Sequence, residues 1–114
     1  MTAWNIIYLP EAKEDLRKLD GSARVLVRKA LHKVSQNPLP RDENGYGVPL
    51  GNKHGSNLAG CMKVKILRIG IRIVYRLIRT EHGMEIIVIG ARADSEVYEE
   101  AVKRLKQKKW EQAR

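Results

Sequence analysis

Residues 61–77, CMKVKILRIGIRIVYRL, decide the fold of this chain. Apolar residues alternate with mostly basic ones in both halves of this stretch, which is typical of two β-strands that each bury one face. Leu67–Gly70 fits a four-residue hairpin loop, and this loop sets Lys65 directly opposite Arg72. A shift of one residue would turn the apolar side chains toward solvent, so the pattern favours this register.

A second hairpin follows the first. We interpret residues 81–83, EHG, as a three-residue loop with its glycine in the left-handed conformation. This loop pairs Arg76 with Val88 and Arg72 with Arg92. In that register Arg72 has a cation on each side, one from each neighbouring strand.

The rest of the chain supplies the outer elements of a single α+β domain. In order, they are a strand over 4–9, two antiparallel helices over 11–19 and from Ser22 to 36, a long loop over 38–60 with at most a short strand near 46–50, the second hairpin's almost wholly apolar strand over 84–91, a helix from Ser95, and a basic tail over 106–114. We therefore predict, over residues 1–114, an N-terminal strand, a helical hairpin, a three-to-four-stranded antiparallel sheet and a C-terminal helix.

The charge of the chain indicates a polyanionic partner. Lys and Arg total 22 against 13 Asp and Glu, a formal net charge of +9, which favours nucleic acid, a membrane surface or an acidic protein. The one cysteine, Cys61, allows no internal disulfide and fits a reducing compartment. The N-terminal residues lack the pattern of a signal peptide, and no apolar run approaches the ~20 residues of a membrane span. We expect a cytoplasmic protein without membrane contact.

The basic residues of the predicted sheet gather on one face. Lys63, Lys65, Arg72 and Arg92 share it, and we call these four residues the cationic cluster. Like charges opposite one another destabilise a sheet, and no acidic residue of the neighbouring strand positions points that way, since Glu85 falls on the opposite parity. Such a face is suited to holding phosphate; the alternative is a face whose charges simply extend into water.

Several segments together resemble a known family. They are residues 58–65, LAGCMKVK, 70–75, GIRIVY, 89–98, IGARADSEVY, and 8–19, YLPEAKEDLRKL. They closely resemble the RelE toxins of the RelE/ParE superfamily, and the likeness extends from about residue 4 to residue 105. It implies a type II toxin–antitoxin toxin, an endoribonuclease that cuts mRNA in the ribosomal A site and so inhibits translation.

The resemblance assigns functional roles to five positions: Lys63, Lys65, Arg72, Arg92 and Tyr98. The chain departs from the pattern at two further positions, where Ala91 and Asp94 replace basic residues that some RelE sequences carry. Neither departure touches the five positions.

The chemistry that we expect is attack by the RNA 2′-hydroxyl on the adjacent phosphate. Lys65 or Tyr98 would be the base, because neighbouring cations lower the pKa of either group. Arg72 and Arg92 would brace the phosphate oxygens and Lys63 would hold the backbone.

Four other residues complete the set of candidates. Arg68 and Arg76 are expected to bind RNA, whereas His54 and Cys61 lack an evident catalytic partner in the sequence. No metal or cofactor is expected.

The expected partners are a cognate antitoxin, the ribosome and mRNA. The antitoxin is expected to dock around residues 97–105 and to form a hetero-oligomeric complex with the toxin. Two alternatives stay open: a ParE-like toxin that inhibits DNA gyrase without cutting nucleic acid, and an RNA-binding module without catalysis.

Overall fold

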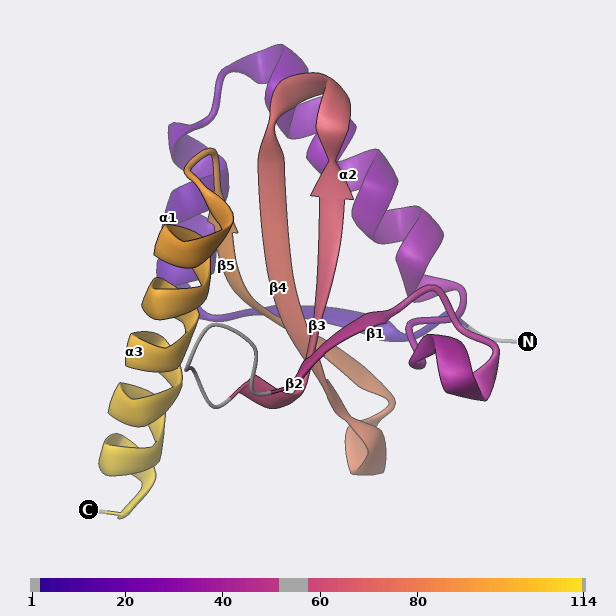
Figure 1. The fold of residues 1–114 in the computed structure, drawn as a ribbon, viewed down its shortest axis with the longest axis vertical. Coiled ribbons are helices and arrows are strands. Elements are labelled where there is room, and N and C mark those ends of the chain that lie inside the picture. Colours follow the sequence, from indigo (N-terminus) through magenta and orange to yellow (C-terminus); the bar gives the residue numbers. More distant parts are fainter. Residues whose placement is uncertain (1–2, 52–57, 114) are drawn as a thin grey trace.

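A computed structural model describes residues 3–51 and 58–113, the last five of these by backbone alone; His54 therefore lies outside the described residues. The elements, shown in Figure 1, are β1 (Asn5–Tyr8), α1 (Pro10–Lys18), α2 (Gly21–Ser35), a short 3-10 turn (Arg41–Glu43), β2 (Val48–Gly51), β3 (Leu58–Ile66), a turn (Leu67–Ile69), β4 (Ile71–Ile78), a turn (Arg79–Glu81), β5 (Gly83–Gly90) and α3 (Asp94–Ala113). The predicted α+β class and order of elements are confirmed.

The strands form one sheet in the order β1-β5-β4-β3-β2. Strands β2 to β5 are antiparallel neighbours, as predicted, whereas β1 joins the sheet parallel to β5. The N-terminal strand thus makes the sheet five-stranded and mixed. The connection from β1 to β2 passes through the helical hairpin, and the short strand near residues 46–50 is β2.

Local sequence signals explain the two helices of the hairpin. Pro10 occupies the first turn of α1, where its missing N–H costs nothing. The carboxylate of Asp20 accepts a hydrogen bond of 2.8 Å from the backbone N–H of Ala23 and so caps α2. The helix begins at Gly21, one residue before the predicted start at Ser22, and the hydroxyl of Ser22 donates a hydrogen bond to Asp20.

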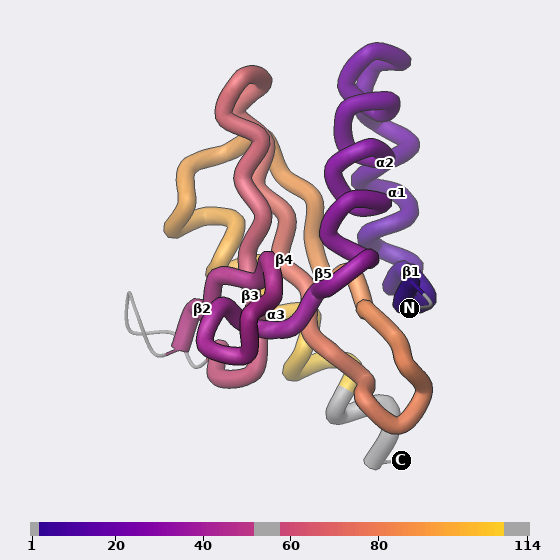
Figure 2. Tube along the Cα trace, turned by 90° about the vertical axis from the view of Figure 1, so that its right-hand side faces the viewer, coloured from indigo at the N-terminus to yellow at the C-terminus, as the bar shows by residue number. Residues whose placement is uncertain are grey.

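Helices cover both faces of the sheet. Figure 2 shows the α1–α2 hairpin against one face, and the hydroxyl of Tyr75 on β4 donates a hydrogen bond of 2.8 Å to the carbonyl of Pro38, just beyond α2. α3 packs against the opposite face, where Val97 lies against Gly90 at the end of β5. Because both faces are covered, all but one residue of β5 is buried. None of the described helices is long and apolar enough to cross a membrane.

The first hairpin has the predicted register, and the second does not. Lys65 pairs with Arg72 across β3 and β4, but Arg72 pairs with Gly90 rather than with Arg92, and Arg76 pairs with Glu85 rather than with Val88. The turn runs over residues 79–82, with His82 rather than a glycine in the left-handed conformation.

A β-bulge in β5 is the second cause of the different register. The pairing steps from Val88 to Ile86 as β4 passes from Val74 to Tyr75, so Ile87 is an extra residue. Because of this extra residue, every β5 side chain before Ile87 points to the opposite face of the sheet from the one that simple alternation predicts. Glu85 therefore shares a face with Arg76, which corrects the expectation that it points to the other side.

The C-terminal basic residues belong to a helix. α3 continues to Ala113, so the segment described as a basic tail extends the helix that crosses the sheet. Its inner side buries Val97, Tyr98 and Ala101. These apolar contacts hold α3 on the face that carries Lys65 and Arg72.

Candidate functional site

Neighbouring strands bring two members of the cationic cluster into direct contact with one carboxylate. Lys65 on β3 and Arg72 on β4 are cross-strand partners whose side chains point toward the start of α3. The Lys65 Nζ atom lies 2.7 Å from Asp94 Oδ2, and the Arg72 Nε atom lies 2.5 Å from Asp94 Oδ1. The sequence predicted that no carboxylate compensates the charge of the cluster. This prediction is wrong, because Asp94 pairs with both Lys65 and Arg72.

The Asp94 carboxylate is held between two cations but stays open to solvent. The side chains of Lys65, Arg72 and Asp94 are 30%, 27% and 31% exposed. Hydrogen bonds from Lys65 and then Arg72 hold the pKa of Asp94 below its ordinary value of 3.8. Each carboxylate oxygen receives one cationic donor, which is also how two oxygens of a phosphate would be held.

Backbone carbonyls fix the Arg72 guanidinium in place. Its Nη1 atom donates to the carbonyl of Gly70 at 2.9 Å and to the carbonyl of Arg92 at 2.8 Å. The first of these belongs to the β3–β4 turn and the second follows β5. Arg72 thus ties together the two segments that flank the cluster, and its Nε–H remains directed at the anion.

Arg92 lies farther from the centre of the cluster than the sequence suggested. Its backbone adjoins Arg72, but its side chain is 79% exposed and its Nε atom lies 4.0 Å from a carboxylate oxygen of Glu96. Lys63 lies on the same face as Lys65, two residues earlier on β3. Asp94 pairs with Lys65 and Arg72, and Glu96 lies near Arg92, so the four cations of the cluster outnumber these two carboxylates and an excess of positive charge remains.

Tyr98 lies one helical turn after Asp94 and is 2% exposed. Burial, followed by the negative charge of Asp94, raises the pKa of Tyr98, and the opposing effect of Arg72 is smaller. The expectation that neighbouring cations lower this pKa is therefore wrong for this arrangement.

The two remaining basic candidates lie in different surroundings. Arg68 is exposed in the β3–β4 turn. Arg76 Nε instead donates at 2.7 Å to Glu85, whose side chain is 3% exposed. Lys108 of α3 bonds the same carboxylate. Sequence reasoning missed this contact because the bulge at Ile87 gives no signal in an apolar run.

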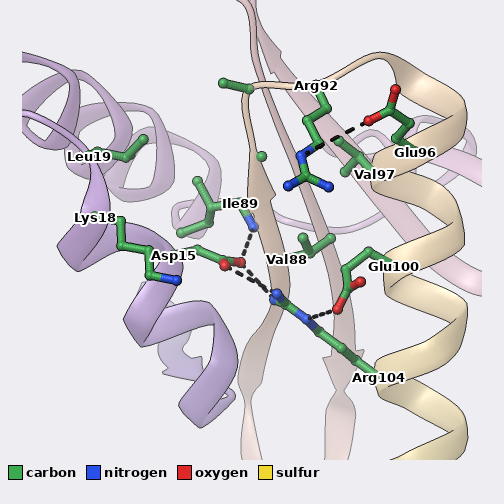
Figure 3. Close-up of a pocket in the computed structure, with 12 residues that line it drawn as sticks. Asp15, Lys18, Leu19, Val88, Ile89, Arg92, Glu96, Val97, Glu100 and Arg104 are labelled. Atoms are coloured by element: carbon green, nitrogen blue, oxygen red, sulfur yellow. Dashed lines mark hydrogen bonds and ion pairs between the residues drawn. The ribbon is translucent and has the colours of Figure 1, made fainter.

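A pocket of about 360 Å³ lies between α1, α3 and the end of β5 (Figure 3), with Arg92 at its rim. β1 pairs with β5 only as far as Ile86. The backbone groups of the later β5 residues on that edge therefore form hydrogen bonds with side chains instead of with a strand. The carboxylate of Asp15 accepts from the N–H of Ile89 at 3.0 Å, and Arg104 donates to the carbonyl of Ile87 at 2.9 Å. Arg104 also bonds Asp15, which closes the network.

Comparisons with curated proteins and with solved structures place this chain among known proteins. The "mRNA interferase toxin RelE" of Escherichia coli K12 is 33% identical over 94 residues, which cover 82% of this chain and 88% of that protein. The "mRNA interferase RelE" of Shigella flexneri matches equally well. The chain belongs to the RelE toxin family. No model in a scan of protein families matches it.

Solved structures of RelE toxins share the fold. A variant of E. coli RelE with two arginines changed to alanine, in the free state, superposes with a TM-score of 0.71 at 29% identity, covering 91% of this chain and 99% of that one. The same variant in complex with a peptide of the antitoxin RelB gives a TM-score of 0.64, also at 29% identity, covering 90% and 98%. The family membership predicted from the sequence is thus confirmed.

Proposed function

We propose that this RelE-family toxin is an endoribonuclease that cuts mRNA in the ribosomal A site and thereby stops translation. One observation supports this proposal above the others: Lys65 and Arg72 hold an anion between them, each donating to a different oxygen. Relatives of this chain are named mRNA interferases, and the held carboxylate has the charge and acceptor pair of an RNA phosphate.

The proposed reaction uses the RNA's own 2′-hydroxyl. A base takes the 2′-proton, the 2′-oxygen bonds to phosphorus, and the bond from phosphorus to the 5′-oxygen breaks as that oxygen gains a proton. The products are a 2′,3′-cyclic phosphate and a 5′-hydroxyl end. Arg72 and Arg92 stabilise the charge that develops on the phosphate oxygens, and Lys63 holds the neighbouring backbone.

Of the two candidate bases Lys65 remains, and to accept the 2′-proton its ammonium group must first release a proton; Tyr98 is the candidate for a positioning residue. The raised pKa of Tyr98 disfavours the phenolate that a base would need. Its ring is 2% exposed, so no face of it is open for an RNA base to stack on, and it is suited to positioning the start of α3 beside the cluster. We propose the reaction without a metal ion.

A cognate antitoxin is the proposed inhibitor of this activity. Structures of relatives contain RelE with RelB antitoxins, including the RelBE2 complex of Mycobacterium tuberculosis. The surface around residues 97–105 of α3 adjoins the cationic cluster, so an antitoxin segment bound there would lie next to the proposed RNA site.

The test is cleavage of mRNA on programmed ribosomes by the single variants Lys65→Ala, Arg72→Ala, Arg92→Ala and Tyr98→Ala. Arg72→Ala is expected to cut at least about 100-fold more slowly, the usual cost of losing one donor to a developing oxyanion. Arg79→Ala is the matched control, because this exposed arginine pairs with Glu43 at the other end of β4. Wild-type rates in all four variants would refute the site assignment.

Two further readouts separate the alternatives. A ParE-like toxin would inhibit DNA gyrase supercoiling and leave mRNA intact. An RNA-binding module without catalysis would bind ribosomes and release no fragments that end in a 2′,3′-cyclic phosphate. The proposed nuclease gives such fragments and leaves supercoiling unchanged.

A further inference from the structure

The anion between Lys65 and Arg72 is part of the protein itself. Asp94, the first residue of α3, places one oxygen against each cation. If these two side chains also hold the substrate phosphate, as the proposed function requires, carboxylate and phosphate need the same donors. Two anions cannot share those donors without strong repulsion. The bound phosphate and the Asp94 carboxylate therefore exclude one another.

The surroundings of Asp94 allow this exchange. All three side chains of the contact are between one quarter and one third exposed, so water can replace the carboxylate as it leaves. Ion pairs at such exposure contribute little free energy. Arg72 keeps its bonds to the carbonyls of Gly70 and Arg92 when Asp94 leaves, so the arginine remains in position to receive a phosphate.

We propose that Asp94 is an internal competitor of the RNA phosphate and sets the affinity of this toxin for its substrate. In the free protein its carboxylate occupies the phosphate position, and RNA must displace it to bind. This inference rests on the proposed function for the identity of the ligand. It assigns to the charge of Asp94 a role that opposes that of Lys65 and Arg72.

The competition predicts a specific change in how RNA affinity depends on salt concentration. Each phosphate that a protein contacts releases counterions from the nucleic acid, and log K falls with log salt by about 0.7 per contact on a single strand. In the wild type the RNA phosphate replaces a carboxylate that already neutralises Lys65 and Arg72. Without that carboxylate, the two cations attract salt anions, and RNA binding releases those anions as well. Removal of the Asp94 charge therefore steepens the salt dependence and tightens binding.

The experiment compares Asp94→Asn and Asp94→Ala with the matched control Glu99→Gln in the full-length toxin. Glu99 lies on the same helix and is exposed, so its variant changes the net charge equally without touching the cluster. The probe is a 70S ribosome programmed with an mRNA whose 2′-hydroxyl at the cleavage position is replaced by hydrogen. This substitution prevents the reaction, so binding is measured alone; single-turnover cleavage of unmodified mRNA is measured in parallel.

Both Asp94 variants are expected to bind about tenfold more tightly than the wild type, with a steeper salt dependence, and Glu99→Gln less than about twofold. Cleavage at saturating ribosomes is expected to change less than binding does. Equal affinities of Asp94→Asn and Glu99→Gln, or weaker binding by both Asp94 variants, would overturn the inference. Weaker binding would show that Asp94 positions the cations.

The outcome is separable from that of the proposed function. Tighter binding by the Asp94 variants without cleavage by any form of the protein would support the competitor and refute the nuclease. Cleavage by the wild type with no effect specific to Asp94 would support the nuclease and refute the competitor.

Discussion

Two carboxylates on the same face of the sheet each bridge two cations, and they differ in burial. Asp94 bridges Lys65 and Arg72 and is 31% exposed, whereas Glu85 bridges Arg76 and Lys108 and is 3% exposed. Arg72 and Arg76 come from the same face of β4, two positions apart on that face. Nearly the same set of charges is thus built twice, once around a carboxylate that is open to water and once around a buried one, and the cations of both sets are partly exposed.

This difference decides which contact can serve binding. A buried carboxylate that loses its cations has no water to replace them, so the Glu85 contact costs more to open than the Asp94 contact, and it joins α3 to β4 and β5. Burial alone would raise the pKa of Glu85, but hydrogen bonds from Lys108 and Arg76 outweigh it and lower the pKa overall. The Asp94 contact can open, and only a contact that opens can admit a phosphate.

The largest effect on stability is expected at the buried contact. Arg76→Ala removes one of the two cations of Glu85 and is expected to lower the free energy of unfolding by about 2 kcal/mol. This is below the ~3–5 kcal/mol of a fully buried pair, because Lys108 remains and Arg76 is itself partly exposed. Urea denaturation measures the change. Arg79→Ala, which breaks a surface pair, is the control and should stay within about 0.5 kcal/mol; equal losses in both variants would contradict the distinction.

The sequence predicted neither of these carboxylate contacts, but it paired the two cations of the Asp94 contact correctly. The β3–β4 register followed from alternating side chains and from a turn that ends at Gly70, which adopts a positive φ of 64°. Lys65 and Arg72 could therefore be paired correctly. In β5 both faces are apolar, so the pattern does not fix the parity, and neither the bulge at Ile87 nor the left-handed His82 has a local signal.

The role of Asp94 needed the three-dimensional structure for a different reason. Comparison with the family pattern showed that Asp94 replaces a basic residue of some RelE sequences. The register of the strands does not show where α3 begins relative to Lys65 and Arg72. Asp94 contacts residues 22 and 29 positions earlier in the chain. Such a contact depends on how α3 crosses the sheet, which is set by the packing of residues such as Val97 against Gly90.

The next largest effect is expected in the pH dependence of stability, to which Glu85 contributes. The folded-state pKa of Glu85 lies below its ordinary value of 4.5, so its ionised form stabilises the fold above about pH 4.5 and this contribution is lost as the pH falls through the lowered value. Glu85→Gln lacks the charge at every pH. Urea midpoints of the wild type and this variant should therefore differ most at pH 7 and converge as the pH drops below about 4.5. A gap that stays constant down to pH 3 would contradict the assignment.

The smallest effect on stability is expected for Asp94→Asn, the variant that is expected to change RNA binding strongly. Asp94→Asn should change the free energy of unfolding by less than about 1 kcal/mol, because the contact is partly exposed and Arg72 keeps its two carbonyl acceptors. The measurement is urea denaturation at pH 7, alongside Arg76→Ala. Both variants break charge contacts on the same face of the sheet. Because Arg76→Ala also removes the packing of the arginine, the comparison that isolates burial is Asp94→Asn against Glu85→Gln, which make the same change from carboxylate to amide. If Asp94→Asn destabilised the protein as much as Arg76→Ala, the Asp94 contact would be a structural clamp that RNA has no means to open, and the comparison between the two carboxylates would fail.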